Sequence, residues 1–283
     1  MSGKIIHRIA EVRSKLREVR ALHKSIGFVP TMGYLHEGHL SLIRRARQDC
    51  DFVVISIFVN PLQFGVGEDY AEYPRDLSRD ARLAFSNGCD LIFAPTVKEM
   101  YPQGFATFVE VGGLTEHLCG ASRPGHFRGV TTVVTKFFNI ITPDHTYFGQ
   151  KDAQQALIIE RMVTDLNLDL TVHILPTIRE ADGLAMSSRN TYLKQEERRA
   201  APVLYRGLCA AQEKIEKGER EVENLINLIT EIITSEPLAK IDYISIVDLD
   251  NLQPIQKITG KALIALAVRF GQTRLIDNII VEV

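Results

Sequence analysis

The chain has 283 residues, 45% of them hydrophobic, and its 33 Lys and Arg residues nearly balance its 35 Asp and Glu residues, for a net charge of −2. This length suits one large or two moderate globular domains, and the charge balance argues against a dedicated nucleic-acid-binding protein. Because the four cysteines match no zinc spacing, the N-terminus is charged and no apolar run approaches the roughly 20 residues of a membrane helix, we expect a cytoplasmic protein with free thiols and no membrane partner.

The first half of the chain predicts helices that alternate with buried strands. Apolar residues at helical spacing predict an amphipathic helix over 5–24, and a short apolar run predicts a strand over 26–29. A second helix is predicted over 40–47. The β-branched run 52–59 is typical of a strand that is buried on both faces, and Pro61 ends it.

The same alternation continues to residue 175. Helices are predicted over 76–87, 130–141 and 153–166, and strands over 90–94, 145–148 and 170–175, with a weakly alternating edge strand over 105–111. This pattern indicates an α/β domain with a parallel, Rossmann-like sheet. No Gly-x-Gly-x-x-Gly motif follows the first strand, which weakens the interpretation as an NAD-dependent dehydrogenase.

The pattern changes after residue 177. A polar loop over 179–190 is followed by predicted helices over 195–217 and 219–234 and by strands over 243–247, 261–270 and 273–281, with a hairpin turn at Gly271 and Gln272. Helices followed by antiparallel strands favour a separate, smaller α+β domain. We therefore place one domain at 1–178 and a second at 179–283.

A turn with two histidines follows the first predicted strand. It contains Gly33, His36, Gly38 and His39, and the next helix is expected to begin near Glu37. A helix N-terminus presents unpaired N–H groups and a partial positive charge, and glycines let the backbone approach a ligand closely. The pattern is typical of a phosphate site, although ordinary surface histidines remain the alternative.

Three further polar clusters lie at strand ends or in loops. Asn60 and Gln63 follow the second strand, Lys151 follows Gly149, and residues 186–189 place two hydroxyls and a guanidinium in succession. Carboxyl ends of parallel strands meet at one edge, where ligands bind, and such side chains suit the oxygens of a triphosphate. Taken singly, Lys151 is equally explained as a solvated residue and the serines as turn caps.

Six motifs, in order along essentially the whole chain, resemble those of the pantoate–β-alanine ligase family, the pantothenate synthetases. The motifs are PTMGYLHEGH at 30–39, VNPLQF at 59–64, YPR at 73–75, RPGHF at 123–127, FGQKD at 148–152 with Gln154 and Gln155, and READGLAMSSRN at 179–190. Together they are far more specific than the histidine turn alone. The main departure is Gln150, where many members carry Glu or Lys.

The resemblance implies a homodimeric ligase that forms pantothenate in two steps. Pantoate attacks the α-phosphorus of ATP to give pantoyl adenylate and pyrophosphate, and the amine of β-alanine then displaces AMP. Mg²⁺ is expected to arrive with ATP. The implied fold is a Rossmann-like, nucleotidyltransferase-type domain with a C-terminal α+β lid that closes over it and excludes water. The reaction needs no covalent enzyme intermediate, in keeping with the lack of a recognisable Ser/His/Asp or Cys/His constellation.

The resemblance also implies roles for individual residues. His36, His39, Lys151 and Arg189 are the expected catalytic residues, with His39 as the implied proton donor. Gln63, Gln155 and Asn60 are expected to bind pantoate or β-alanine. Asp80 is expected to reach Mg²⁺ through water, with a solvated helix residue as the alternative. The residues expected to contact ATP are Pro30, Thr31, Met32, Gly33, His36, His39, Gly149, Lys151, Asp152, Ile178, Met186, Ser187, Ser188 and Arg189.

Three other functions are compatible with parts of the pattern. A class I aminoacyl-tRNA synthetase-like enzyme shares the histidine turn and a loop containing Met and Ser, but this chain is short and has no basic face for RNA. A simple nucleotidyltransferase would adenylate a phosphate and not a carboxylate. A non-catalytic nucleotide sensor would not need His36, His39, Lys151 and Arg189 together.

Overall fold

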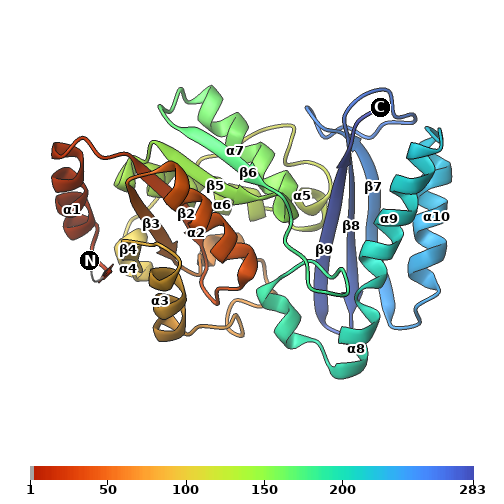
Figure 1. Cartoon of the computed structure of the whole chain (residues 1–283), viewed down its shortest axis with the longest axis horizontal. Coiled ribbons are helices and arrows are strands. Elements are labelled where there is room, and N and C mark those ends of the chain that lie inside the picture. Colours follow the sequence, from red (N-terminus) through yellow and green to blue (C-terminus); the bar gives the residue numbers. More distant parts are fainter. Residues whose placement is uncertain (1–2) are drawn as a thin grey trace.

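The computed structural model describes residues 3–283, which form two sheets flanked by helices (Figure 1). The first sheet has six parallel strands in the order β1-β4-β3-β2-β5-β6, and the second has three antiparallel strands in the order β7-β8-β9. The strands are Lys4–Ile6 (β1), Ile26–Thr31 (β2), Phe52–Ile57 (β3), Leu91–Phe93 (β4), His145–Gly149 (β5), Thr171–Leu175 (β6), Ala239–Asp248 (β7), Ala262–Phe270 (β8) and Thr273–Val281 (β9). The predicted fold class is confirmed.

Ten α-helices and three 3₁₀ helices connect or cover these strands within the described residues. The 3₁₀ helices are Pro61–Gln63 (η1), Gln150–Asp152 (η2) and Ser188–Tyr192 (η3). The α-helices are Ile9–Ala21 (α1), Glu37–Asp49 (α2), Leu77–Ser86 (α3), Val97–Met100 (α4), Cys119–Ser122 (α5), His126–Ile141 (α6), Ala153–Asp165 (α7), Gln195–Ala200 (α8), Val203–Glu216 (α9) and Val222–Thr234 (α10). None of the helices in residues 3–283 has both the length and the apolar character that crossing a bilayer requires.

Strands β2 and β3 bury side chains on both faces, as their continuous apolar runs predict. Phe28 and Val54 point into a cluster shared with α1, α6 and α7, whereas Val29 and Ile55 point into a cluster shared with α2 and α3. All four side chains are fully buried. The period of two along each strand therefore fixes which helices cover which face.

The strand order creates a crevice beside β2. The chain moves from β2 through α2 to β3 on one side, and later returns to place β5 on the other side of β2. In open parallel sheets, ligands bind at such a switch in direction, outside the carboxyl ends of the strands. The turns after β2 and β5 are the histidine turn and the Lys151 turn.

The second sheet packs helices on one face and the first domain on the other. Along β8, Ile264 and Leu266 join the cluster formed with α9 and α10, while Leu263 and Ala265 join the cluster of the first domain. Such burial on both faces explains why β8 reads as a continuous apolar run. The predicted boundary at 178 lies between the last strand of one sheet and the helices of the other, but the apolar core continues across it.

Two helix predictions need correction. Residues 4–6 form β1 and not the start of a helix over 5–24, because Lys4–Ile6 pair with the edge of β4. A three-residue strand carries too short a pattern to compete with helical spacing. Pro202, which lacks a backbone N–H, stands at the break between α8 and α9 in the helix predicted over 195–217.

The stretch around α6 also differs from the prediction. The helix begins at His126, four residues earlier than predicted, and the short helix α4 lies between the segments predicted as strands over 90–94 and 105–111. The edge strand predicted over 105–111 is wrong. Its segment lies along α6, where the backbone of Val109 bonds the hydroxyls of Thr131 and Thr132. The backbone of this segment bonds threonine side chains of α6 where a strand would bond a neighbouring strand. The local sequence does not show which of these partners the backbone has.

The close approach of α6 to η1 generates a stability prediction for Gly129→Ala. A Cβ at this position would lie 2.6 Å from the backbone nitrogen of Gln63 and would also meet the Leu62 carbonyl. We expect the variant to lose about 1–3 kcal/mol of unfolding free energy, since backbone atoms yield less readily than a flexible side chain. Urea unfolding measures this loss. Gly260→Ala, which meets no atom within 4 Å, should stay within about 0.5 kcal/mol of wild type, and equal stability of the two variants would contradict the prediction.

Candidate active site

Most of the residues singled out from the sequence line one cavity of about 220 Å³ at the carboxyl ends of β2 and β5. This crevice lies at the switch in strand direction, where a ligand is expected. Gly33 and Asp80 do not line it. The predicted residues that do are Pro30, Thr31, Met32, His36, His39, Asn60, Gln63, Gly149, Lys151, Asp152, Gln155, Ile178, Met186, Ser187, Ser188 and Arg189.

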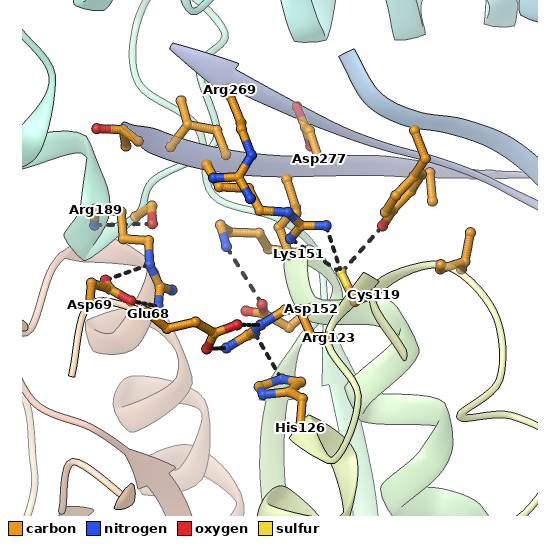
Figure 2. Close-up of a pocket in the computed structure, with 18 of the residues that line it drawn as sticks. Glu68, Asp69, Cys119, Arg123, His126, Lys151, Asp152, Arg189, Arg269 and Asp277 are labelled. Atoms are coloured by element: carbon orange, nitrogen blue, oxygen red, sulfur yellow. Dashed lines mark hydrogen bonds and ion pairs between the residues drawn. The ribbon is translucent and has the colours of Figure 1, made fainter. Parts of the chain in front are cut away.

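A second, larger cavity of about 870 Å³ adjoins the first. The first domain lines one side of it and strands β8 and β9 line the other, so the cleft runs between the domains (Figure 2). The two cavities share seven residues, which are Arg123, His126, Lys151, Asp152, Gln155, Ser187 and Arg189. A long ligand therefore has room to extend from the histidine turn past Lys151.

His36 and His39 cap the N-terminus of α2 with their own side chains. Nδ1 of His36 accepts from the Gly38 amide at 3.2 Å, and Nδ1 of His39 accepts from the His36 amide at 3.3 Å. The ring centroids are 4.0 Å apart. Since Nδ1 accepts in both rings, each neutral imidazole carries its proton on Nε2, where it is available to a ligand.

Both rings are held in the neutral form. Burial lowers the pKa of His36 to about 2, with further lowering by His39, Lys151 and Arg79. Burial also lowers the pKa of His39 to about 4, against the opposing pull of Asp152. At neutral pH the pair is therefore two hydrogen-bond donors without charge.

Asp80 holds the histidine turn from behind. Its carboxylate accepts from the Tyr34 and Leu35 amides, each at 2.7 Å, and lies 3.3 Å from Arg79. A Cβ on Gly33, whose φ is +88°, would lie 2.9 Å from the same carboxylate. Because Asp80 is only 1% exposed, these contacts favour a structural role over the predicted water-mediated contact with magnesium.

Asn60 and Gln63 form a unit at the end of β3. The Asn60 amide donates to Gln63 Oε1 and to the Gly129 carbonyl, both at 3.1 Å, and its Oδ1 accepts from Tyr101 at 2.8 Å. Asn60 is 1% exposed, and its side-chain amide is hydrogen-bonded to protein groups. The Gln63 side chain, oriented by Asn60, lines the cavity beside Met32.

Neighbouring glutamines on α7 have different environments. Gln154 is buried, donates to the Leu114 and His117 carbonyls and accepts from the Cys119 amide. Gln155 lines both cavities, as do Lys151 and Asp152, whose charged groups are 3.6 Å apart. Successive residues of a helix point in different directions, so Gln154 is buried against the 114–119 segment while Gln155 lines the cleft.

The loop over 179–190 is more ordered than its polar composition predicts. It forms a small hairpin in which Met186 donates to the Ile178 carbonyl at 3.0 Å. Beyond the hairpin, Ser187 caps η3 and the Ser188 hydroxyl donates to the Tyr34 carbonyl at 3.2 Å. The loop of the second domain is therefore bonded directly to the histidine turn.

Acidic residues in the loop after η1 pair with the arginines of the cleft. Asp69 accepts from Arg189 through two bonds of 2.9 Å, and Glu68 pairs with Arg123 (Figure 2). Partial burial alone would raise the pKa of Glu68, but the contacts with Arg123 outweigh it and lower the pKa to about 2. The arginines are therefore neutralised by carboxylates that a stronger anion can replace.

Arg123, His126, Glu68 and Asp69 are among the cleft residues to which the sequence assigned no role. Arg123 and His126 lie in the RPGHF motif, and His126 contacts the Gln63 carbonyl at 2.8 Å and Arg123 at 3.1 Å. Burial, followed by the Arg123 charge, lowers the pKa of His126 to about 4. Glu68 and Asp69 lie outside the six sequence motifs. Only the fold brings their loop opposite Arg123 and Arg189.

These side chains suit a ligand rich in anionic oxygens. Two neutral imidazole donors, one lysine and two arginines face a common cleft, and uncharged amides stand beside them at Gln63 and Gln155. Across residues 3–283, no group of three or more His, Cys, Asp or Glu side chains is arranged to hold a metal ion.

Comparison with known proteins adds an independent finding. The family model described as pantoate-beta-alanine ligase matches residues 4–280. The pantothenate synthetase of Heliobacterium modesticaldum is 64% identical over 280 residues, covering 99% of this chain and 100% of that protein. The pantothenate synthetase of Pelotomaculum thermopropionicum is 62% identical over 276 residues, covering 98% of each.

Solved structures agree with these relatives. The crystal structure of pantothenate synthetase from Thermus thermophilus has a TM-score of 0.93 and 49% sequence identity, covering 98% of each chain. Pantoate-beta-alanine ligase from Francisella tularensis, complexed with beta-gamma ATP and beta-alanine, has a TM-score of 0.80 and 35% identity, covering 98% of this chain and 97% of that one.

The buried histidines generate a prediction for the pH dependence of stability. Below the unfolded pKa of about 6.5, unfolded His39 binds a proton while the folded ring stays neutral down to about pH 4. Stability should therefore decrease as the pH falls through this range. His39→Asn should reduce the slope by roughly 1 kcal/mol per pH unit, as measured by urea unfolding at pH 8, 7, 6 and 5. The two proteins should show equal slopes above pH 7, and equal slopes below pH 6.5 would contradict the assignment.

Proposed function

This chain belongs to the pantoate–β-alanine ligase family, and from that premise we propose how its own residues carry out the reaction. It condenses pantoate with β-alanine to form pantothenate at the expense of ATP, which becomes AMP and pyrophosphate. The observation that carries the assignment is the convergence of His36, His39, Lys151 and Arg189 on one cleft beside two uncharged glutamine amides. The match over residues 4–280 disfavours the alternatives of a tRNA synthetase-like enzyme or a nucleotide sensor.

In the first step, a pantoate carboxylate oxygen forms a bond to the α-phosphorus of ATP. The bond from that phosphorus to the bridging oxygen breaks, and pyrophosphate leaves with the electron pair. Negative charge grows on the phosphate oxygens as this happens, so fixed donors have their largest effect there. The Nε2–H groups of His36 and His39 would supply such donors. Because they are already oriented, no free energy is needed to reorganise solvent dipoles in the transition state.

The departing pyrophosphate needs cationic partners. Lys151, Ser187 and Arg189 line both cavities. They would therefore contact the β- and γ-phosphates as these move towards the larger cavity. Arg189 would exchange its Asp69 partner for phosphate oxygens, since a charge-assisted bidentate pair is available to either anion. Asp152, Gly149 and the backbone at Ile178 would hold the adenosine.

In the second step, the amine nitrogen of β-alanine forms a bond to the acyl carbon of pantoyl adenylate. The bond from that carbon to the AMP oxygen breaks, and the nitrogen loses a proton. Gln63 and Gln155 would bind the pantoate hydroxyls and carboxylate, because each amide offers both donors and an acceptor. Asn60 would contribute by orienting Gln63.

Mg²⁺ is proposed to enter with ATP and to keep phosphate and water ligands. The described residues form no metal cage, which fits an ion that is carried by the substrate. When bound, the ion would reduce the negative charge of the triphosphate. Carboxylates that such an ion could meet in the cleft are Asp152, which lines both cavities, and Asp69, which lines the larger one.

The function is tested by incubating the purified chain with pantoate, β-alanine and ATP and detecting pantothenate and AMP. Both products should form in equal amounts, and removal of Mg²⁺ by a chelator should stop the reaction. Omission of β-alanine should leave pantoate-dependent exchange of pyrophosphate into ATP. Failure of the wild-type chain to make pantothenate, or exchange that depends on an amino acid instead of pantoate, would overturn the proposal.

We infer that the chain is a homodimer and that residues 179–283 close over residues 1–178 as a lid. The lid is suggested by Ser188, which bonds the histidine turn from the second domain, and by the open cleft between the domains. Small-angle scattering should give the mass of two chains of 31.8 kDa each and a smaller radius of gyration with ATP and pantoate. The mass of one chain would exclude the dimer, and an unchanged radius would exclude closure.

A cytoplasmic location is proposed because all four cysteines are free thiols, which suits a reducing compartment. The substrate ATP is also made and used in that compartment. Fractionation of cells that express the native chain tests this, and recovery in a membrane or secreted fraction would contradict it.

His39→Ala and Lys151→Ala should each lower turnover by on the order of 10²-fold or more, the effect of losing one donor to a developing oxyanion. The melting temperature should change little for Lys151→Ala, since within residues 3–283 its ammonium group pairs only with Asp152. Steady-state assays measure the loss. His23→Ala and Lys240→Ala change the same residue types at exposed positions and should retain wild-type rates, whereas wild-type rates in the cleft variants would refute their roles.

A further inference from the structure

Strand β9 presents alternate side chains to the two domains. Ile276 joins the apolar cluster of the first domain, while Leu275 joins the cluster formed with α9 and α10. By the period of two along a strand, residues 274, 276 and 278 face the first domain. Their polar members contact it directly, because Arg274 donates to Ser122 at 3.1 Å and Asn278 contacts η2.

Asn278 contacts the turn that carries the phosphate-site lysine. Its side-chain nitrogen donates to the carbonyls of Gln150 and Lys151, each at 2.9 Å. The side chain is 4% exposed, so water does not compete for these bonds. Two N–H donors on one nitrogen match two successive carbonyls, an arrangement that aspartate, serine or an apolar side chain cannot reproduce.

The position of Asn278 is itself fixed by its neighbour on the other face of the strand. The Asp277 carboxylate is 2% exposed and accepts from Arg179 at 2.6 and 3.0 Å. The Arg179 guanidinium lies 3.8 Å from the centre of the Tyr205 ring on α9. Asp277 also accepts from the Asn278 amide at 2.8 Å. A buried, fully paired anchor of this kind leaves the Asn278 side chain little freedom.

We propose that Asn278 is a positioning residue for phosphoryl transfer, holding the 150–151 turn so that the Lys151 ammonium meets the leaving phosphates. The proposal deepens the function assigned above and rests on the role given there to Lys151. The second domain would then support the phosphate site at two points. Asn278 on β9 bonds the 150–151 turn, and Ser188 in the loop over 179–190 bonds the histidine turn. Small misplacement of a catalytic group is costly, so a side chain that never touches substrate can still affect the rate.

A double-mutant cycle between Asn278 and Lys151 tests the proposal. The rate measured is pantoate-dependent exchange of pyrophosphate into ATP, which reports the first step alone. Asn278→Ala should lower this rate by roughly 10- to 100-fold, the range expected for a displaced catalytic group, with the KM for pantoate within about twofold of wild type. In a Lys151→Ala background, Asn278→Ala should lower the rate by less than about twofold, because the residue through which it acts is already absent.

Matched variants separate positioning from general loosening of the domain interface. Arg274→Ala removes an interdomain contact from the same face of β9 but does not touch η2, and its exchange rate should stay within about twofold of wild type. Gln150→Ala removes only the weak 3.5 Å contact of a side chain with Asn278 Oδ1 and should behave likewise. If Asn278→Ala does not fold, Asn278→Thr, which keeps a strand-forming shape, replaces it in the cycle.

The outcomes are distinct. Three outcomes would overturn the positioning role while the wild-type chain still makes pantothenate. The fold-losses of Asn278→Ala and Lys151→Ala could multiply in the double variant, the exchange rate of Asn278→Ala could be unchanged, or Arg274→Ala could lose as much activity as Asn278→Ala. Absence of pantothenate from the wild-type chain would instead overturn the proposed function. A wild-type rate in Lys151→Ala would overturn the role of that lysine and, with it, the proposal for Asn278.

Discussion

Two buried hydrogen bonds to Asp80 support the rest of the site. They hold the Tyr34 and Leu35 amides, and thereby a turn that must pass close to Asp80 at Gly33, where only glycine avoids a clash. This turn determines where α2 starts, and the two histidines cap the N-terminus of that helix. Because both Nδ1 atoms are used in capping, both Nε2–H groups are committed to the cleft. A buried carboxylate on the turn thus helps to determine how the two Nε2–H groups are oriented.

The charge pattern of the cleft follows from what it has to hold. Neutral histidines avoid mutual repulsion at a ring separation of 4.0 Å, and burial keeps them neutral. The arginines remain charged but are paired with Asp69 and Glu68. An unpaired guanidinium in a partly buried position would be unfavourable, so the loop carboxylates stabilise the arginines in the cleft.

The second domain is more than a cover for the first. Its sheet contributes Leu263 and Ala265 to the core of the first domain, and its polar contacts reach two separate parts of the site. Ser188 bonds the histidine turn and Asn278 bonds the Lys151 turn. The geometry of the candidate site therefore depends on how the two domains pack.

The fold class and most of the residues that line the candidate site could be predicted from the sequence. Continuous apolar runs such as 52–57 are sufficient to identify buried parallel strands, and a motif such as PTMGYLHEGH marks the site because its residues are adjacent in the chain. The three-dimensional contacts were needed to see that Asp80 bonds the histidine turn, that Asn60 bonds Gln63, that Glu68 and Asp69 line the cleft, and that Asn278 bonds the Lys151 turn. Residues 105–111 likewise lie along α6 and not in a strand. The reason is the same in each case: these contacts join residues that are distant in the chain or depend on burial, and local sequence patterns encode neither.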